Sequence, residues 1–460
     1  MSKYLYYQEN DYELYKGKMQ EVLSTFDEGS IDSIICDPPY ELNFMGKGWD
    51  NSGVAFQKDT WEHCFRVLKE GGYLLAFGGT RTFHRIACAI EDAGFEIRDC
   101  IMWLYGSGFP KSMNIGLAID KKMGLPNRGH RIAVANRYHP DGTLEPNGEN
   151  LPEYECKTEL AKKWQGWGTA LKPAYEPIIV ARKPFKCSLV ENIMQNGVGG
   201  LNIDECRIAT TEDLSRINGT DNGMFGIGNN NNVAQKCKEL GIEYGGRFPA
   251  NVILTYDETD YEEVCGGMPT TKSTTTTSMP NLSDKNAEIG IYSKLNAERI
   301  EHLGGYNDEG SASRYFYCAK ASKKDRDEGL ELFEAKQKPE YCLQYHNGEK
   351  RNENVTQKNI HPTVKPVELM QYLVRLVTPK NGTILDCFMG SGSTGKAVMF
   401  ENRERNANYK FIGVEMTDEY LPICKARIDY AKNKYEYDLI KEQEELKEKG
   451  ITSIFDFMED

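Results

Sequence analysis

The sequence lacks the features of several large protein classes. Its 13 cysteines are scattered and no two are separated by two residues, so neither a zinc ribbon nor a disulfide framework is indicated. Histidine occurs seven times without a His-Glu-x-x-His pair, so no metal is expected. No run approaches the roughly 18 apolar residues of a membrane helix, and the N-terminus has no apolar segment of signal-peptide length. These absences predict a soluble, cytoplasmic protein.

The chain also lacks an excess of basic residues. Its 460 residues carry a formal net charge of −13, which taken as a whole counts against a nucleic-acid partner. The acidic excess is concentrated in residues 1–30, in the run from Asp257 to Glu263 and in residues 433–460. Because the rest of the chain is neutral, its overall charge does not exclude DNA binding.

Strand-like and helix-like patterns alternate in residues 14–184 and again after His361, which is typical of a parallel α/β sheet. Gly71-Gly72 is expected to end one of the helices, before a strand that begins at Tyr73. Residues 185–345 are irregular and include Gly/Asn-rich and Thr/Ser-rich stretches. The predicted organisation is an α/β domain split by an insert: 1–184, insert 185–345, 346–432, and an acidic tail 433–460.

A glycine-rich loop, Phe388-Met389-Gly390-Ser391-Gly392-Ser393-Thr394, joins a predicted strand to a predicted helix. Glycines let a ligand approach the main chain, and a helix N-terminus favours an anionic group. The alternative of a P-loop requires a hydroxyl residue after Lys396, where this chain has Ala397. Glu415 closes the next predicted strand, at the distance from the glycines where an acidic residue often binds ribose hydroxyls. Together these features indicate a nucleoside cofactor.

The second motif, Asp37-Pro38-Pro39-Tyr40, follows a predicted buried strand, 31–36. The two prolines have no N–H groups, so their carbonyl oxygens lack local donors, and Asp37 adds a carboxylate acceptor. Tyr40 offers a face on which a base can stack. This combination suits a planar group that carries an NH₂, although a proline-turned loop with a packed tyrosine is the simpler alternative.

Taken together, Asp37–Tyr40 and Asp386–Thr394 resemble the amino-DNA methyltransferases, which transfer a methyl group from S-adenosylmethionine to an exocyclic base nitrogen. The segment from His361 to Pro366 resembles a further motif of that family, as do residues 67–72 and 176–180. The order, with the catalytic motif first and the cofactor motif last, resembles the β class, and phage or prophage members in particular. The resemblance implies a Rossmann-like, circularly permuted α/β fold with a seven-stranded, mostly parallel sheet and an inserted target-recognition region.

The resemblance also implies roles for individual residues. The target adenine would be flipped out of the duplex, with catalysis by Asp37, Pro38, Pro39 and Tyr40. S-adenosylmethionine would be bound by Asp386, Phe388, Gly390, Gly392, Ser393, Thr394, Glu415, Thr363 and Lys365, the last two at its carboxylate. One departure is Lys18 after Gly17, where family members often have Gly-Asp, so a cofactor contact there is in doubt.

DNA contacts are expected in two places. Lys47 and Trp49 lie in the loop that follows the Pro-Pro motif, and a cluster of basic residues with interleaved aromatic residues lies in the insert: Arg314, Lys320, Lys323 and Lys324. Simple packing of Trp49 and a solvated face for the cluster are the alternatives. Methylation of cytosine N4 and, less favoured, of a protein glutamine are alternative reactions. The recognition sequence, dimer formation and a restriction partner are left open.

Overall fold

The computed structural model describes most of the chain in 14 stretches: residues 2–42, 52–105, 112–125, 136–138, 144–146, 155–208, 246–256, 270–273, 308–311, 316–320, 324–337, 345–346, 349–350 and 356–434. The chain divides into two compact units. The first comprises Met1–Gly106, Tyr175–Phe333 and Asn359–Asp460, and the second comprises Ser107–Ala174 and Glu334–Lys358. In the described stretches, no helix has the length and apolarity needed to cross a membrane.

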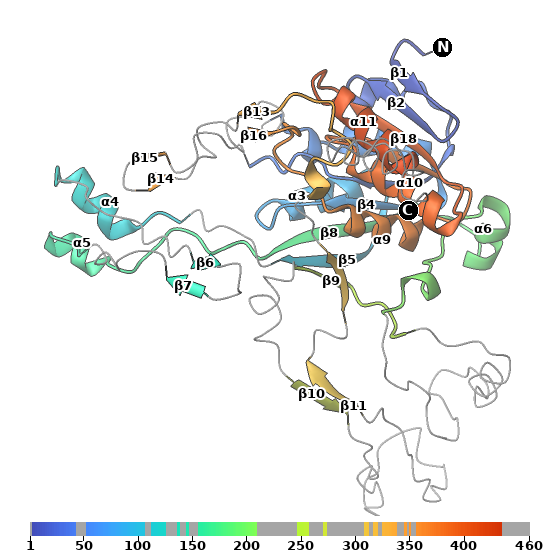
Figure 1. Cartoon of the computed structure of the whole chain (residues 1–460). Coiled ribbons are helices and arrows are strands. Elements are labelled where there is room, and N and C mark those ends of the chain that lie inside the picture. The colour runs from blue at the N-terminus through green and yellow to red at the C-terminus, as the bar shows by residue number, and fades with distance from the viewer. Residues whose placement is uncertain are drawn as a thin grey trace, which may run out of the picture. The chain divides into compact units, whose positions relative to one another are not determined.

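A ten-stranded sheet forms the centre of the first unit (Figure 1). Eight strands run in one direction, while β1 and β8 run in the other. In spatial order the strands are β1 (Leu5–Gln8), β2 (Tyr12–Lys16), β18 (Lys410–Glu415), β17 (Thr383–Asp386), β3 (Ile31–Cys36), β4 (Leu68–Phe77), β8 (Tyr175–Arg182), β5 (Glu96–Tyr105), β9 (Val252–Tyr256) and β12 (Tyr317–Lys320).

The predicted mostly parallel, Rossmann-like α/β fold is confirmed by this sheet. Its seven strands from β2 to β5 correspond to the predicted seven-stranded core, and β1 extends it at one edge. At the other edge β9 and β12 come from residues 185–345, where the sequence suggested an irregular module. Part of the insert therefore belongs to the central sheet.

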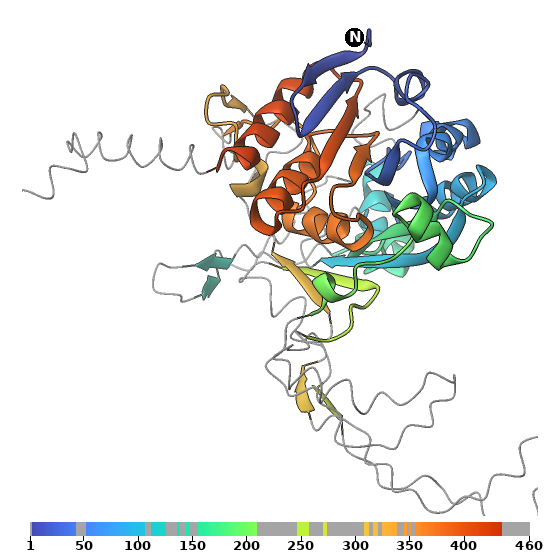
Figure 2. The ribbon, with the colours of Figure 1, turned by 90° about the vertical axis from the view of Figure 1, so that its right-hand side faces the viewer.

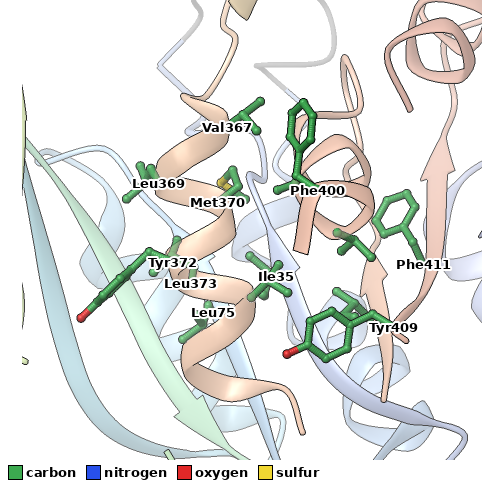
Figure 3. Packing of buried hydrophobic residues seen from close by; sticks show 14 of the residues in the cluster. Ile35, Leu75, Val367, Leu369, Met370, Tyr372, Leu373, Phe400, Tyr409 and Phe411 are labelled. Carbon is green, nitrogen blue, oxygen red and sulfur yellow. The ribbon is translucent and has the colours of Figure 1, made fainter. Parts of the chain in front are cut away.

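Helices cover both faces of the sheet (Figure 2). One face carries α1 (Met19–Leu23), α2 (Lys58–Val67) and α3 (Phe83–Asp92), and the other carries α9 (Val367–Val377), α10 (Ser393–Arg405) and α11 (Leu421–Lys432). Successive residues of a strand point to opposite faces. Ile34 and Leu74 accordingly pack with the first set of helices, whereas Ile35 and Leu75 pack beneath α9 (Figure 3).

The Gly71-Gly72 pair does not end a helix, contrary to the sequence prediction. Helix α2 ends at Val67, and strand β4 runs through both glycines, where its register with β3 shifts. Gly71 has φ +82°, and a Cβ there would lie 2.1 Å from the Asn192 amide nitrogen. The pair therefore permits an irregular strand and a close approach of the neighbouring helix α6 (Leu189–Asn196).

The remaining described elements are short. In the first unit they are η3 (Val54–Phe56), η4 (Asp204–Cys206), η6 (Lys324–Arg326) and the antiparallel pair of β10 (Thr270–Ser273) with β11 (Asp308–Ser311). The second unit contains α4 (Ile115–Lys122), α5 (Glu159–Lys163) and three two-stranded sheets: β6 (Asn136–Tyr138) with β7 (Leu144–Pro146), β13 (Lys336–Gln337) with β16 (Thr356–Gln357), and β14 (Tyr345–His346) with β15 (Glu349–Lys350). Buried Asp120 accepts hydrogen bonds from Lys157 and Thr158 and so fixes the start of α5.

Candidate active site

The two sequence motifs leave neighbouring strands of the sheet. Strands β3 and β17 pair in parallel, with Ser33 opposite Ile384 and Ile34 opposite Leu385. Asp37 and the loop that follows Asp386 therefore emerge side by side at the carboxyl edge of the sheet. In open α/β sheets this edge is where ligands bind.

Asp386 is buried beneath the glycine-rich loop. One of its oxygens accepts the Phe388 N–H at 3.1 Å and the other accepts the Thr394 hydroxyl. Burial raises the pKa of Asp386 well above its usual value. Both carboxylate oxygens thus tie together the two ends of the loop, so Asp386 shapes the loop from below.

The two glycines predicted to contact a cofactor both adopt left-handed conformations, with φ +57° at Gly390 and +77° at Gly392. A Cβ at Gly390 would lie 2.9 Å from Nε2 of His361, and one at Gly392 would lie 3.0 Å from the Cα of Cys424. Glycine is therefore required at both positions by conformation and by space. Behind them, Ser393 and Thr394 begin helix α10.

Glu415, at the end of β18, supports the same loop from its other side. Its two oxygens accept the Gly390 N–H at 2.9 Å and the Thr417 N–H at 2.7 Å. Burial raises its pKa, although the backbone donors oppose this shift. Since each carboxylate oxygen has a further lone pair, Glu415 can still accept a hydroxyl group.

Lys396 makes contacts that are incompatible with a P-loop. Its side chain is fully buried in helix α10, and its ammonium group lies 2.9 Å from Asp325 and 3.0 Å from Glu328. Asp325 also accepts the Val367 N–H at the start of α9. The lysine thus holds the end of the insert against the helices instead of reaching a phosphate, in agreement with the mismatch at Ala397.

Arg427 links the same segment to the glycine-rich loop. It is fully buried and donates to the Ser391 carbonyl at 2.7 Å, to the Ser393 hydroxyl at 3.2 Å and to the Asp325 carbonyl at 3.1 Å. The pKa of its guanidinium is lowered by burial. The loop is therefore braced by the protein itself.

Four side chains form a compact polar cluster beside the Pro-Pro motif, which we call the target-side cluster: Asp37, Tyr40, Glu176 and Lys365. The Lys365 ammonium lies 2.6 Å from Asp37, 3.2 Å from the Tyr40 hydroxyl and 3.4 Å from Glu176. The Tyr40 hydroxyl lies 2.8 Å from a carboxylate oxygen of both Asp37 and Glu176. Pro38 is buried and Pro39 is half-buried between these groups and the strand.

Lys365 remains charged in this position although its side chain is only 9% exposed. Burial alone would lower its pKa, but the charges of Asp37 and Glu176 outweigh burial and raise it. The ammonium also lies 4.9 Å from the ring centre of Phe77 and 5.4 Å from that of Tyr40. Lys365 is therefore held among Asp37, Tyr40 and Glu176, and its predicted contact with the cofactor's carboxylate stays a prediction.

The neighbouring segment, 359–366, contacts the glycine-rich loop. The His361 ring donates from Nδ1 to the Thr363 carbonyl and packs edge-on against Tyr420, with ring centres 4.7 Å apart. Arg326, from the end of the insert, donates to the carbonyls of Asn359 and His361. Thr363 itself is exposed. Of the two residues predicted for the cofactor's carboxylate, it is the one with an exposed side chain.

The predicted DNA contacts cannot be located. Lys47, Trp49, Arg314 and Lys323 lie outside the described residues. Lys320 ends strand β12 and Lys324 begins η6, and their side chains are not among those described. All six predicted DNA contacts, including Lys320 and Lys324, therefore stay predictions.

Sequence reasoning missed the role of Glu176 and of Asp325. Glu176 was noted only as part of a family-like segment, and its proximity to Tyr40 depends on the antiparallel strand β8. For Glu176, the sequence shows only an acidic residue near the start of a strand, and such a residue does not by itself indicate a functional site. Asp325 stands beside the basic residues of the insert and has no predicted role.

Comparisons with known proteins identify the family of this chain. The chain matches the family model of DNA methylases, N6_N4_Mtase, over residues 31–426 and belongs to that family. The predicted relationship to DNA methyltransferases is thereby confirmed at the level of the family.

Individual relatives align over shorter parts. The type II methyltransferase M.HindIII of Haemophilus influenzae is 28% identical over 150 residues, or 31% of this chain and 37% of that protein. M.BglI of Bacillus subtilis is 35% identical over 91 residues, or 19% of this chain and 24% of that protein. The chain thus spans well under two thirds of these relatives. The solved structure of the PvuII DNA methyltransferase, described as cytosine-N4-specific, has a TM-score of 0.40 at 13% identity, covering 93% of this chain and 89% of that one.

Proposed function

We propose that this protein transfers a methyl group from S-adenosylmethionine to the exocyclic N6 of adenine in DNA. The observation that carries the proposal is the adjacency of the two motifs on the paired strands β3 and β17. It brings a carboxylate beside a tyrosine and a glycine-rich loop at a helix start to one edge of the sheet. A methyl donor and a planar amine could meet there.

The cofactor side has the features that a nucleoside with a charged amino-acid end requires. We assign the binding of the ribose hydroxyls to Glu415, and the close approach of the cofactor to the main chain to Gly390 and Gly392. The half-buried Phe388 would cover the ligand, while Asp386 with Ser393 and Thr394 would hold the loop in shape. Of the two residues predicted for the carboxylate, we favour the exposed Thr363, and Lys365, which pairs with Asp37 and Glu176, is the alternative. When bound, the cofactor supplies a methyl group on a positively charged sulfur, which is already a good leaving group.

The target side has the features that an aromatic amine requires. Asp37 and the Pro38 carbonyl would accept the two amine hydrogens, which directs the nitrogen lone pair toward the methyl group. The Tyr40 ring would stack on the flipped base and offset part of the few kcal/mol that flipping costs. Positioning and electrostatics can then supply the catalysis without a covalent intermediate.

The other assignments belong to the same proposal. Residues 185–345 would form the target-recognition region between the catalytic half, 1–184, and the cofactor half, 346–432. Lys47, Trp49, Arg314, Lys320, Lys323 and Lys324 would contact DNA. Because the proposed substrate is DNA, we assign the protein to the cytoplasm.

The test is to incubate the protein with S-adenosylmethionine labelled in its methyl group and with duplex DNA, RNA or a protein mixture. We expect label in DNA, recovered as N6-methyladenine after digestion to nucleosides. Asp37→Ala should lose transfer, whereas the exposed control Asp59→Ala should retain it. Label in protein alone would overturn the proposal. Recovery of N4-methylcytosine instead of N6-methyladenine would show that cytosine is the target base. Undiminished transfer by Asp37→Ala would refute the role of Asp37.

A further inference from the structure

The Tyr40 hydroxyl occupies an unusual position between two carboxylates. It lies 2.8 Å from Oδ1 of Asp37 and 2.8 Å from Oε2 of Glu176. A phenol has a single proton, so it can donate to only one of the two carboxylates at a time. The hydroxyl can therefore pass a proton from one side to the other by accepting on the first and donating on the second.

The proposed reaction releases a proton at this place. As the N–C bond forms and the S–C bond breaks, the amine nitrogen becomes cationic and one of its two hydrogens must leave. Asp37 is the acceptor closest to the proposed amine position. A base bound over Asp37 would also separate this carboxylate from water, so the proton needs another way out.

We propose that Glu176 is the terminal acceptor of this proton, which reaches it from Asp37 through the Tyr40 hydroxyl. The inference rests on the proposed function. Asp37 takes the proton from the amine and passes it to the Tyr40 oxygen, while the Tyr40 hydroxyl donates its own proton to Glu176. At the end Asp37 is again a carboxylate, Tyr40 is again a phenol, and Glu176 carries the proton. The 21% exposed side chain of Glu176 can then release it to water.

The other members of the target-side cluster are consistent with this direction. Burial and the two carboxylates raise the pKa of Tyr40 well above its usual value, which disfavours a phenolate. The Tyr40 oxygen must therefore accept a proton from Asp37 at the same time as it donates its own to Glu176. Lys365 keeps a raised pKa and hence its own proton, which excludes it as the acceptor. Its ammonium group lies against both carboxylates and the Tyr40 oxygen and so holds the three groups together.

Two nearly isosteric variants test the relay. Tyr40→Phe keeps the stacking ring but removes the hydroxyl, and Glu176→Gln keeps the shape but removes the acceptor. Because a positioned base typically contributes a factor of about 100 or more, we expect each variant to slow single-turnover methyl transfer by about 100-fold. The dissociation constants for S-adenosylmethionine and DNA should not change.

The double variant is decisive. Removing two parts of one relay should cost no more than removing either part, so Tyr40→Phe with Glu176→Gln should be as slow as each single variant. The dependence of the rate on pH should change in the same way in all three proteins, which a merely structural role would not cause. Glu176→Asp, which retains a carboxylate, should recover part of the rate and provides a second variant should Glu176→Gln not fold.

A matched control lies on the edge strand. Tyr7 donates to Glu9 at 2.5 Å, and Glu9 pairs with Lys432 at 2.7 Å. This tyrosine, glutamate and lysine contact one another as Tyr40, Glu176 and Lys365 do, but they lie away from the Pro-Pro motif. Tyr7→Phe and Glu9→Gln should retain the full transfer rate. Losses that multiply in the double variant, or losses confined to the dissociation constants, would overturn the relay. A wild-type protein that methylates no DNA would instead overturn the proposed function.

Discussion

The two halves of the candidate site hold their carboxylates in opposite ways. On the cofactor side, Asp386 and Glu415 mainly accept main-chain N–H groups, those of Phe388, Gly390 and Thr417, with the Thr394 hydroxyl as a further donor to Asp386. On the target side, Asp37 and Glu176 instead bind the side chains of Lys365 and Tyr40. A main-chain donor is fixed by the fold, whereas a side-chain donor can change partner.

This difference suits two different tasks. A loop braced by Asp386, Glu415 and Arg427 is already in shape before a ligand arrives, so little ordering entropy is lost on binding. The target-side cluster must exchange its hydrogen bonds when an amine enters and a proton leaves. Changes on the cofactor side should therefore alter binding and stability, and changes on the target side should alter the reaction rate.

The largest effect is expected for Asp386→Ala. This change leaves the Phe388 N–H and the Thr394 hydroxyl without their buried acceptor, which should lower the free energy of unfolding by about 3 kcal/mol. The loop should lose its shape and with it most of the affinity for S-adenosylmethionine. Thermal denaturation and calorimetric titration measure both, with exposed Asp92→Ala as the control. Retained affinity would show that the loop does not need its brace.

Next comes Lys365→Met, which removes the cation between Asp37 and Glu176. Two carboxylates and a phenol then face each other without a positive charge, so we expect transfer to slow by about 100-fold, the scale typical of losing one charge-stabilising group. The affinity for the cofactor should stay the same, and the exposed control Lys58→Met should be unaffected. If the affinity falls instead, Lys365 holds the cofactor's carboxylate, as the sequence predicted.

A smaller effect is expected for Lys396→Met, on the cofactor side but away from the ligand. Removing this cation takes away the ion pair of Glu328 and one of the partners of Asp325, which keeps Arg427 and the Val367 N–H. Because both carboxylates are partly exposed, we expect a loss of about 2 kcal/mol of stability. Transfer by the folded fraction should be normal. Stabilisation of the wild type by magnesium and ATP would contradict this structural role, because it would indicate a P-loop.

The smallest effect is a pH dependence from His361. Burial, together with the neighbouring charges of Lys365 and Arg326, lowers its pKa from 6.5 to about 4, although the Thr363 carbonyl and Asp37 oppose the shift. Because the unfolded chain then binds a proton more readily, stability should be complete above pH 6.5 and fall as the pH drops toward 4. Thermal melts across this range should show the decline, and His361→Gln should flatten it. An identical decline in that variant would exclude His361 as its source.

The sequence was sufficient where function depends on residues that are close along the chain. The glycine-rich loop, the Pro-Pro motif and the strands that precede them were predicted, because strand periodicity and turn residues are local signals.

The features that were not predicted all depend on long-range packing. Lys365 meets Asp37 only because α9 packs over β3, and Glu176 meets Tyr40 only because β8 pairs with β4. Gly71-Gly72 was interpreted as a helix end because its actual neighbours, Asn192 and Asp32, are distant along the chain. The joining of β9 and β12 to the sheet has no local signal either.

The most direct test of the division between the two sides is the equilibrium binding of S-adenosylmethionine to Asp37→Asn, measured beside single-turnover transfer to DNA by the same preparation. We expect a dissociation constant equal to that of the wild type together with a transfer rate reduced by about 100-fold or more. A variant that binds the cofactor poorly, or one that transfers at the wild-type rate, would contradict the assignment of binding to the braced loop and of chemistry to the target-side cluster.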